Sequence, residues 1–231
     1  MSGPDPARAI EKYRRHAARY DATAARTMAL RQRTIGLLGL KAGDVVLDVA
    51  CGTGLSFPLL RDGVGPTGKV IGVELSPEML AQARGRVESN GWTNVVLIQA
   101  AMEDARVSER LDAILFNYTH DVLRSPAALE RIFACARPGA RVAVAGVKHP
   151  PWWLYLARLW RLANARPYLT SFEGLDRPYS LLERHVPDLA ITPVLLGTNY
   201  IGAGRTSHPI GDFSRSGIRP SDSHNRETLE A

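Results

Sequence analysis

Short apolar runs alternate with amphipathic stretches through the middle of the chain. Buried strands are expected at five apolar runs, 45–50, 70–75, 95–99, 111–117 and 141–147. Helices are expected at 55–61, 76–90 and 125–136, and the last two open with Ser-Pro, an N-cap residue followed by one that suits the first helical position. Strands and helices that alternate in this way predict an α/β fold, a doubly wound and mostly parallel sheet.

The two flanks break this alternation. The Ala- and Arg-rich stretch 7–38 predicts helix, with a break at Asp21-Ala22-Thr23 and a stop at Gly39. Beyond the core, His149-Pro150-Pro151 interrupts the chain before an aromatic helical stretch. Further expectations are a turn at 137–139, a short helix at 178–185 and two strands at 194–196 and 199–203.

These patterns divide the chain into four parts. The expected parts are a helical cap at 1–38, a ligand-binding core at 39–147, a lid with the last strands at 148–204 and a tail at 205–231. The third part is expected to complete the same domain as the core. The tail is polar and poor in apolar residues, which predicts disorder.

The chain has 29 Lys and Arg residues against 23 Asp and Glu residues, a net charge of +6. This excess favours an anionic partner, such as nucleic acid, an acidic membrane surface or a phosphorylated small molecule. Much of the excess lies at 1–35 and 148–184. Two cysteines are too few for a disulfide framework or a Cys-rich metal site. No leader peptide and no apolar run of about 18 residues is found, so a cytoplasmic protein is expected.

The most informative segment is VVLDVACGTG, from Val45 to Gly54. A predicted strand carries Asp48 just inside its C-terminal end, and a Gly-Thr-Gly turn leads into a helix. Glycines there let the backbone approach a ligand without Cβ clashes. Glu74 ends the next predicted strand, where a carboxylate can accept two hydrogen bonds from a ribose diol. Both acids are expected in the crevice at the carboxyl ends of the strands, where doubly wound sheets bind ligands.

Two classes of cofactor use a glycine turn of this kind. A nicotinamide site favours a third glycine, which packs helix against strand, but here Phe57 and then Pro58 follow. Asp48 would also repel a pyrophosphate, whereas it suits the ammonium of a methionyl group. The residues therefore favour a cofactor with a methionyl group over a dinucleotide and over a turn that binds nothing.

LDVACGTG together with VIGVELSPEML resembles the class I S-adenosylmethionine-dependent methyltransferases, near the quinone C-methyltransferase and small-molecule type 11 branch. The resemblance covers about residues 40–147 and implies a Rossmann-like sheet of seven strands, the last one antiparallel. It implies S-adenosyl-L-methionine as cofactor, with its methionyl part at Asp48, Gly52 and Gly54. It further implies that Glu74 holds the ribose hydroxyls and that Leu75 flanks the adenine.

One position departs from the family pattern. The family usually has an Asp after the third strand to contact the adenine amine, and this chain has Ala101 there, between Ala100 and Met102. The backbone N–H of Met102 is the remaining expected contact, and Glu103 or Asp104 is the alternative source of a carboxylate.

A second likeness lies before the core. Tyr20-Asp21 resembles a Tyr-Asp pair of this branch, which implies that Tyr20 closes over the cofactor. The alternative is an ordinary core tyrosine.

The end of the fourth predicted strand, 117–121, opens onto the same crevice. Asn117 is assigned to the cofactor site, and His120 is the candidate general base because its pKa range suits proton transfer at neutral pH. The alternative for His120 is a loop histidine that only packs or hydrogen-bonds. No Asp/Asn-Pro-Pro-aromatic motif follows Asn117, and Cys51 and Cys135 are expected to be a loop spacer and a core residue. A nucleic-acid acceptor is therefore disfavoured.

The stretch Trp152–Tyr168 carries three tryptophans along one helical stripe. We expect a lid over the acceptor pocket, and the alternative is a helix in peripheral contact with an anionic membrane. The predicted activity is in-line methyl transfer to a small organic or lipid-like acceptor. The alternatives are a phospholipid-headgroup N-methyltransferase at the membrane surface, an RNA-modifying enzyme and a non-catalytic cofactor-binding regulator.

Overall fold

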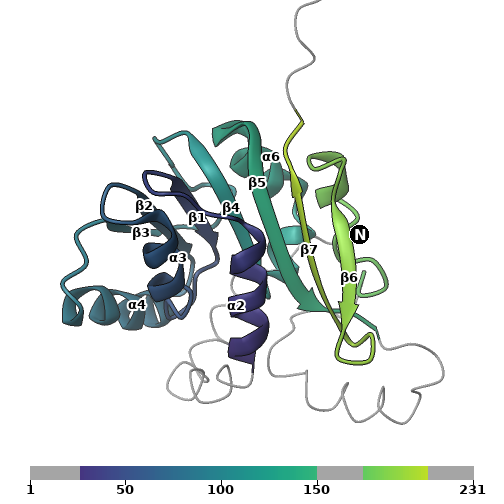
Figure 1. The fold of residues 1–231 in the computed structure, drawn as a ribbon, viewed down its shortest axis with the longest axis horizontal. Helices are drawn as coiled ribbons and strands as arrows, with labels where there is room; N and C mark the ends of the chain where they lie inside the picture. Colours follow the sequence, from purple (N-terminus) through teal and green to yellow (C-terminus); the bar gives the residue numbers. More distant parts are fainter. Residues whose placement is uncertain (1–26, 150–173, 208–231) are drawn as a thin grey trace, which may run out of the picture.

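A single sheet of seven strands organises the part of the chain that the computed structural model describes, residues 27–149 and 174–207. Its strands lie in the order β3-β2-β1-β4-β5-β7-β6 (Figure 1). Their bounds are β1 Val45–Val49, β2 Lys69–Glu74, β3 Val95–Gln99, β4 Leu111–Asn117, β5 Ala136–Val147, β6 Ala190–Val194 and β7 Asn199–Arg205. The first five strands pair in parallel, and β7 runs antiparallel to both of its neighbours. The predicted doubly wound, mostly parallel sheet with an antiparallel last strand is confirmed.

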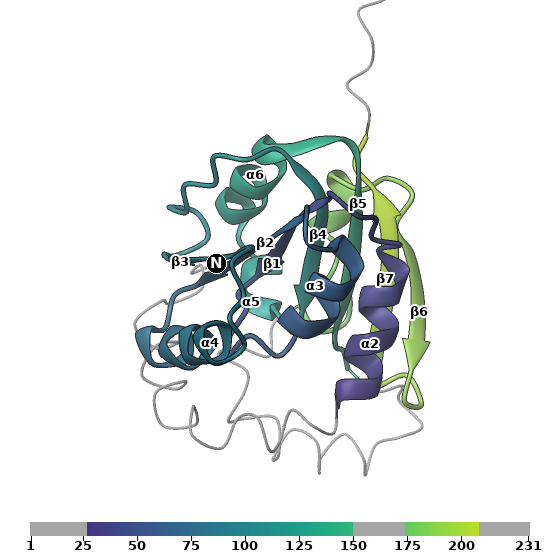
Figure 2. The ribbon, with the colours of Figure 1, turned by 60° about the vertical axis from the view of Figure 1, so that its left-hand side comes forward.

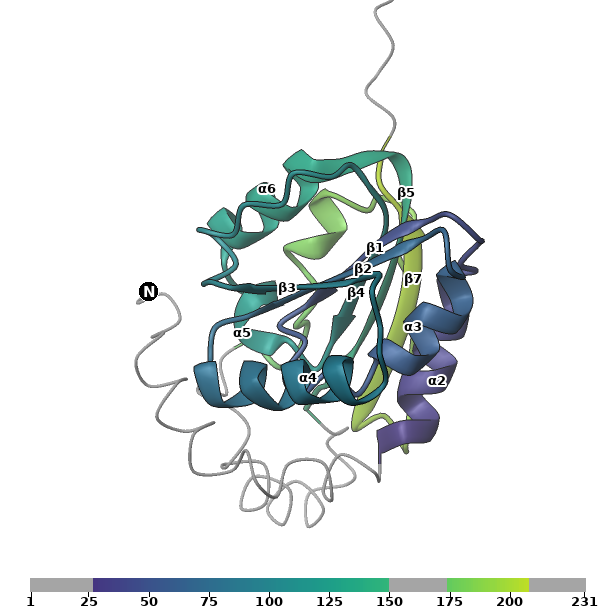
Figure 3. The same cartoon turned by 90° about the vertical axis from the view of Figure 1, so that its left-hand side faces the viewer.

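Helices cover both faces of this sheet (Figures 2 and 3). One face carries α2 (Met28–Leu37), α3 (Phe57–Val64) and α4 (Pro77–Ser89), and the other carries α5 (His120–Leu123) and α6 (Pro126–Cys135). Alternate residues of the central parallel strands join the two apolar clusters, so Val46 belongs to the α2–α3 side and Leu47 to the α6 side. Burial on both faces explains why the strands read as nearly continuous apolar runs.

The predicted helix caps are present. The Ser76 hydroxyl accepts a hydrogen bond from the N–H of Met79 at 3.3 Å, and the Ser125 hydroxyl accepts one from Ala128 at 3.2 Å. Gly91, with a φ of 61°, follows the end of α4. These caps satisfy N–H groups that the first helical turn leaves without partners.

Two predictions around the last strands were wrong. The segment 137–139, predicted as a turn, lies inside β5, where the pairing with β4 shifts register and Gly139 takes a φ of 73°. The bulge keeps the strand continuous across a sequence that looks like a turn. The strand predicted at 194–196 ends at Val194 instead. Leu195 and Leu196 form the hairpin turn with positive φ and are 63% and 72% exposed, although they are apolar.

Smaller differences concern the ends of elements. The helix expected at 178–185 is reduced to a 3-10 turn, Leu182–Arg184. The start of the predicted tail belongs to the domain, because β7 continues to Arg205 and the N–H of Thr206 donates to Ala140 O at 2.9 Å. Cys135, at the end of α6, packs against the main apolar cluster but is half-buried, so its prediction as a buried core residue is confirmed only in part.

Several predictions fall outside the described residues. These are Tyr20, the first part of the helical cap, the aromatic stretch Trp152–Tyr168 and most of the tail. Among the helices that are described, none is long and apolar enough to cross a bilayer. Nor do the described residues contain a group of three His, Cys, Asp or Glu side chains that could hold a metal ion.

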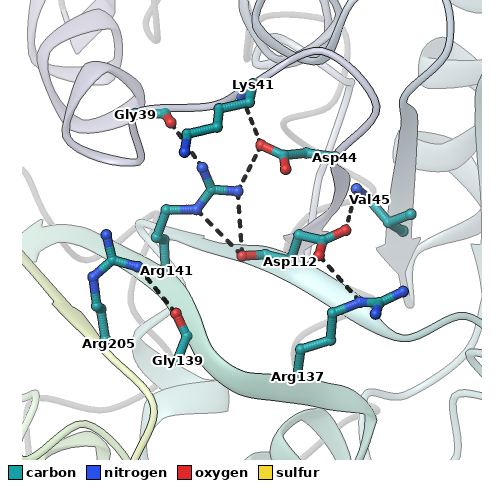
Figure 4. Close-up of polar contacts among 9 residues, drawn as sticks. All are labelled: Gly39, Lys41, Asp44, Val45, Asp112, Arg137, Gly139, Arg141 and Arg205. Atoms are coloured by element: carbon teal, nitrogen blue, oxygen red, sulfur yellow. Dashed lines mark hydrogen bonds and ion pairs between the residues drawn. The ribbon is translucent and has the colours of Figure 1, made fainter.

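A polar network ties the loop before β1 to β4 and β5, at the amino ends of the parallel strands (Figure 4). Arg141 donates to Gly39 O at 2.7 Å and pairs with Asp44 at 2.6 Å, and both charged side chains are 13% exposed. Asp112 accepts from the N–H of Val45 at 2.9 Å and pairs with Arg137 at 3.1 Å. A cavity of about 460 Å³ lies beside this network, at the end of the sheet opposite to the carboxyl-end crevice.

Candidate functional site

The sheet register brings the predicted site residues to one end of the molecule. Val49 of β1 lies level with Val73 of β2 and with Phe116 of β4. Glu74 and Asn117 are the next residues of those two strands, so their positions flank the loop that leaves β1. The carboxyl ends of adjacent parallel strands therefore form the crevice expected for ligand binding in such sheets.

The glycine turn after β1 depends on backbone conformations that favour glycine. Gly52 has a φ of 59° and Gly54 a φ of 78°. A Cβ at Gly54 would lie 2.5 Å from the ring of Phe57, and one at Gly72 of β2 would lie 2.8 Å from the same ring. Phe57 is fully buried and fills the space beside both glycines. This packing accounts for the phenylalanine where a dinucleotide site would have its third glycine.

Asp48 is a buried acid with an unused hydrogen-bonding atom. It is 2% exposed, and its Oδ2 has no hydrogen-bond partner among the described residues. Burial raises the pKa of Asp48 from 3.8 to about 7, although the charge of Arg31 and a hydrogen bond with Ser56 lower it. A cationic ligand at Oδ2 would satisfy this atom and stabilise the carboxylate.

Glu74 is held at the end of β2 by backbone donors. Its two carboxylate oxygens accept from the N–H of Gly52 at 3.0 Å and from that of Ser76 at 2.8 Å. Burial raises the pKa of Glu74, and these backbone hydrogen bonds oppose the shift. Each oxygen can accept a further bond, so the carboxylate can still receive a pair of ligand hydroxyls.

The thiol of Cys51 lies in the same loop, where the residue is buried. Burial raises its pKa well above 9, and the charges of Asp48 and Glu74 add to the shift. A thiol that stays protonated is a weak nucleophile. This environment agrees with the prediction that Cys51 is a small spacer.

Residues predicted to flank the adenine follow β2 and β3. Leu75 and Ala101 are half-buried and Met102 is buried. The N–H of Ala100 donates to Glu74 O at 3.2 Å, which keeps the two strand ends together. Glu103 and Asp104, the alternative sources of a carboxylate, are exposed in the turn that follows.

The end of β4 contributes a second set of polar groups to the crevice. Asn117 and Thr119 are buried, and their side-chain polar atoms have no hydrogen-bond partner among the described residues. Between them Tyr118 has a φ of 62°, a conformation that aromatic residues rarely adopt. His120 is buried as the first residue of α5.

The sequence reading missed Arg31 and Ser56. Arg31 is 4% exposed on α2, and its Nη1 donates to the Ser56 hydroxyl at 2.6 Å. One signal could have identified it, because Arg31 shares a helical face with Thr34, Ile35 and Leu38 at spacings of three, four and seven residues. An arginine on an apolar face is an informative exception to the usual burial pattern.

The geometry agrees with comparisons to known proteins. A family model described as a methyltransferase domain matches residues 40–164. The demethylmenaquinone methyltransferase of Lactococcus lactis is 32% identical over 165 residues, which are 68% of this chain and 64% of that protein. The 2-phytyl-1,4-naphtoquinone methyltransferase of Thermosynechococcus vestitus is 28% identical over 176 residues, 71% of this chain and 74% of that protein. The chain thus spans a little under two thirds of the Lactococcus protein.

Solved structures agree at the level of the fold. A S-adenosylmethionine-dependent methyltransferase from Aquifex aeolicus superposes with a TM-score of 0.55 at 23% identity, over 76% of this chain and 89% of that one. The residues at the crevice fit the cofactor of that family, because Asp48 offers an unsatisfied acceptor for an ammonium and Glu74 offers acceptors for hydroxyls. The resemblance inferred from the sequence is confirmed, and the chain belongs to the methyltransferase-domain family, with the class I fold.

Proposed function

We propose that the protein transfers the methyl group of S-adenosylmethionine to a small acceptor of the quinone type. The observation that carries the proposal is the pair of buried acids, Asp48 and Glu74, on either side of a glycine turn at the ends of adjacent strands. The quinone methyltransferases among the relatives support the acceptor class.

In this proposal each residue has a defined part in holding the cofactor. Asp48 would accept from the methionyl ammonium, and Glu74 would accept from the two ribose hydroxyls. Leu75 and Met102 would lie against the adenine, and Gly52 and Gly54 would let the backbone approach the ligand. When bound, the cofactor supplies an electrophilic methyl group on a sulfonium.

The protein's own contribution to the rate is then positioning and exclusion of water. The acceptor would enter from the β4 side, where Asn117 and Thr119 have hydrogen-bonding atoms available. In-line displacement requires the accepting atom to face the methyl group opposite the sulfur. His120 would take the proton that a hydroxyl-bearing acceptor loses.

The acceptor class is tested by incubating the full chain with methyl-labelled S-adenosylmethionine and three separate acceptors. These are a reduced demethylnaphthoquinone in detergent, phosphoethanolamine and total RNA. We expect label in the quinol fraction. Label in phosphoethanolamine would favour the headgroup N-methyltransferase, and label in RNA the RNA-modifying enzyme. Cofactor binding without label in any acceptor would favour a non-catalytic regulator.

The role of His120 is tested by His120→Ala with the acceptor identified above. A general base predicts a fall in turnover of about 10²–10⁴-fold with little change in S-adenosylmethionine affinity. Thr206→Ala is the control for a general loss of stability, because this residue follows β7 and its hydroxyl donates to Arg137 O, away from the end of β4. Full turnover by His120→Ala would show that the reaction needs no base at this position.

A further inference from the structure

The hairpin between β6 and β7 exposes two leucines at its tip. Leu195 and Leu196 are 63% and 72% exposed, the highest values among the large apolar side chains that the structure describes. Both have a positive φ, of 50° and 56°. Turns with positive φ usually carry Asn, Asp or Gly, which adopt this conformation at little cost and suit an exposed position. Two leucines are unfavourable here for the backbone and for hydration alike, so the fold alone does not account for them.

Hydrogen bonds hold the tip in one conformation. The N–H of Gly197 donates to Val194 O at 3.0 Å. The N–H and the hydroxyl of Thr198 donate to Leu195 O at 3.1 and 2.7 Å. Thr198 O in turn accepts from the N–H of Lys148, the residue that follows β5, at 3.0 Å. The turn therefore presents its leucines in a fixed position relative to the sheet.

The tip lies at the end of the sheet to which the arrow of β5 points, the same end as the candidate cofactor site (Figure 1). β7 runs antiparallel to β5, so Asn199 at its start lies level with Val147 at the end of β5. The Asn199 amide also donates to the Tyr118 hydroxyl at 3.2 Å, beside the end of β4. A surface that binds the leucines would therefore face the end of the molecule at which we place the acceptor.

The chemistry of the hairpin favours a lipid surface as the partner. No charged residue occurs from Ala190 to Gly204, so no charge on the hairpin would have to leave water if its tip entered a bilayer. Lys148, partly exposed at the base of the hairpin, provides a positive charge for an anionic headgroup. The net charge of the chain, +6, has the same sign. An apolar tip beside a cation matches the interface of an anionic bilayer.

A second copy of the chain is the competing occupant of this tip. A standard interface between two proteins buries about 800 Å² on each partner, which two leucine side chains cannot supply. Pairing between two β6 edges is also disfavoured, because Pro193 has no N–H to donate. A bilayer needs no such area, since a few apolar side chains and a nearby cation give weak, reversible binding.

We propose that Leu195 and Leu196 insert into the surface of an anionic phospholipid bilayer, with Lys148 against the headgroups. This contact turns the carboxyl ends of the strands towards the membrane, so an apolar acceptor dissolved there reaches the crevice without passing through water. The inference goes beyond the proposed function, and vesicle binding tests it without cofactor or acceptor.

The first experiment is co-sedimentation of the full chain with sucrose-loaded vesicles of equal parts phosphatidylglycerol and phosphatidylcholine. Leu195→Asn/Leu196→Asn should weaken vesicle binding at least about tenfold, because two apolar side chains are no longer transferred from water. Asn tolerates positive φ better than Leu, so this variant should unfold at the same denaturant concentration as the natural chain or at a higher one. Leu37→Asn is the matched control, since Leu37 is 45% exposed at the opposite end of the sheet. It should bind vesicles as the natural chain does.

The second experiment locates the contact and tests its charge. An environment-sensitive fluorophore is attached at Leu196→Cys in a Cys135→Ser background, in which Cys51 remains but is buried. Its emission should shift to the blue when vesicles are added, whereas the same label at Leu37→Cys should not respond. Lys148→Gln should weaken binding to the anionic vesicles about fivefold and leave binding to pure phosphatidylcholine unchanged.

Four results would overturn the inference. The natural chain could fail to bind the vesicles, the double asparagine variant could bind as tightly as the natural chain, or the label at position 196 could stay in water while the chain binds. The last of these would assign the contact to another segment. A dimer seen by light scattering that dissociates in the asparagine variant would make the tip an interface between copies. None of these results depends on methyl transfer, so the proposed function would fail or stand separately.

Discussion

The side-chain amide of Asn199 donates to the hydroxyl of Tyr118 at 3.2 Å, which joins the start of β7 to the end of β4 across the intervening β5. Tyr118 also donates its backbone N–H to Ala145 O of β5 at 2.8 Å. Its positive φ is therefore fixed by contacts on both sides. Strained residues of this kind persist where the surroundings determine them, and they cluster at ligand sites.

We predict a measurable coupling between these two residues. Tyr118→Phe should lower the free energy of unfolding by about 1 kcal/mol, because it removes one hydrogen bond to a buried amide. In a double-mutant cycle with Asn199→Ala, the double variant should lose less stability than the sum of the two single losses, by at least about 0.5 kcal/mol. Chemical denaturation of the four proteins measures the coupling, and strict additivity would show that the contact contributes nothing.

A second prediction concerns Asp48 in the cofactor-free protein. Its pKa is about 7 when folded and 3.8 as a free group, so the folded state holds the proton more tightly. Protonation of Asp48 makes its full contribution to the free energy of unfolding below about pH 4, and this contribution is lost as the pH rises to about 7. Above pH 7 the buried charge costs up to about 4 kcal/mol.

Asp48→Asn removes that charge while keeping the shape of the side chain. We expect the variant to be more stable than the natural chain at pH 8 and to lose this advantage towards pH 4. Chemical denaturation of both proteins across this pH range measures the difference in their free energies of unfolding. The other titrating groups are the same in both proteins, so this difference reports on Asp48. A variant that is less stable than the natural chain at pH 8 would contradict the burial argument.

The same pKa predicts how S-adenosylmethionine affinity depends on pH. Binding of the ammonium requires Asp48 as a carboxylate, so the affinity should fall as Asp48 is protonated below about pH 7. From pH 7 to pH 6 the expected fall is about fivefold, while the ligand's own amine stays protonated. Titrations at pH 7 in two buffers of different ionisation enthalpy should also show proton release. An affinity that stays constant from pH 7 to pH 5.5 would count against Asp48 as the ammonium ligand.

A fourth prediction concerns the network at the amino ends of the strands. Arg141→Ala removes the charged partner of Asp44 and a donor to the Gly39 carbonyl, in a position where both charged groups are only 13% exposed (Figure 4). The N–H of Lys41 still donates to Asp44 at 2.6 Å. Loss of one member of such a pair should cost about 2–3 kcal/mol, somewhat less than for a fully buried pair. Cofactor affinity should not change, since the network lies at the other end of the sheet. Weaker cofactor binding in a folded Arg141→Ala would contradict this separation.

The fold was largely predictable because its signals are local. Apolar runs, Ser-Pro caps and the glycine turn each specify a strand, a helix start or a loop within a few residues. The errors arose where pairing with distant strands decides the conformation. Arg137-Pro138-Gly139 has the composition of a turn, yet it continues β5 because β4 pairs with the residues on both sides.

The part of the candidate site that lies in a local motif was predictable, and the part contributed by distant elements was not. Asp48, Glu74 and the glycines belong to one motif and its neighbouring strand, and the sheet register brings them together. Arg31 lies 17 positions before Asp48, outside the motif, and in the sequence only its helical spacing from the apolar face of α2 indicates that it is buried. The unusual φ of Tyr118 likewise depends on β5 and β7, and nothing in the local sequence indicates it.

The most direct test of the central claim is a calorimetric titration of S-adenosylmethionine into the natural chain, Asp48→Ala and Glu74→Ala. Asp62→Ala serves as the control, because this acid is exposed on α3 outside the crevice. The natural chain and Asp62→Ala should bind with equal affinity, whereas each of the other two variants should bind at least about tenfold more weakly. Unchanged affinity in both Asp48→Ala and Glu74→Ala would contradict a cofactor site between β1 and β2.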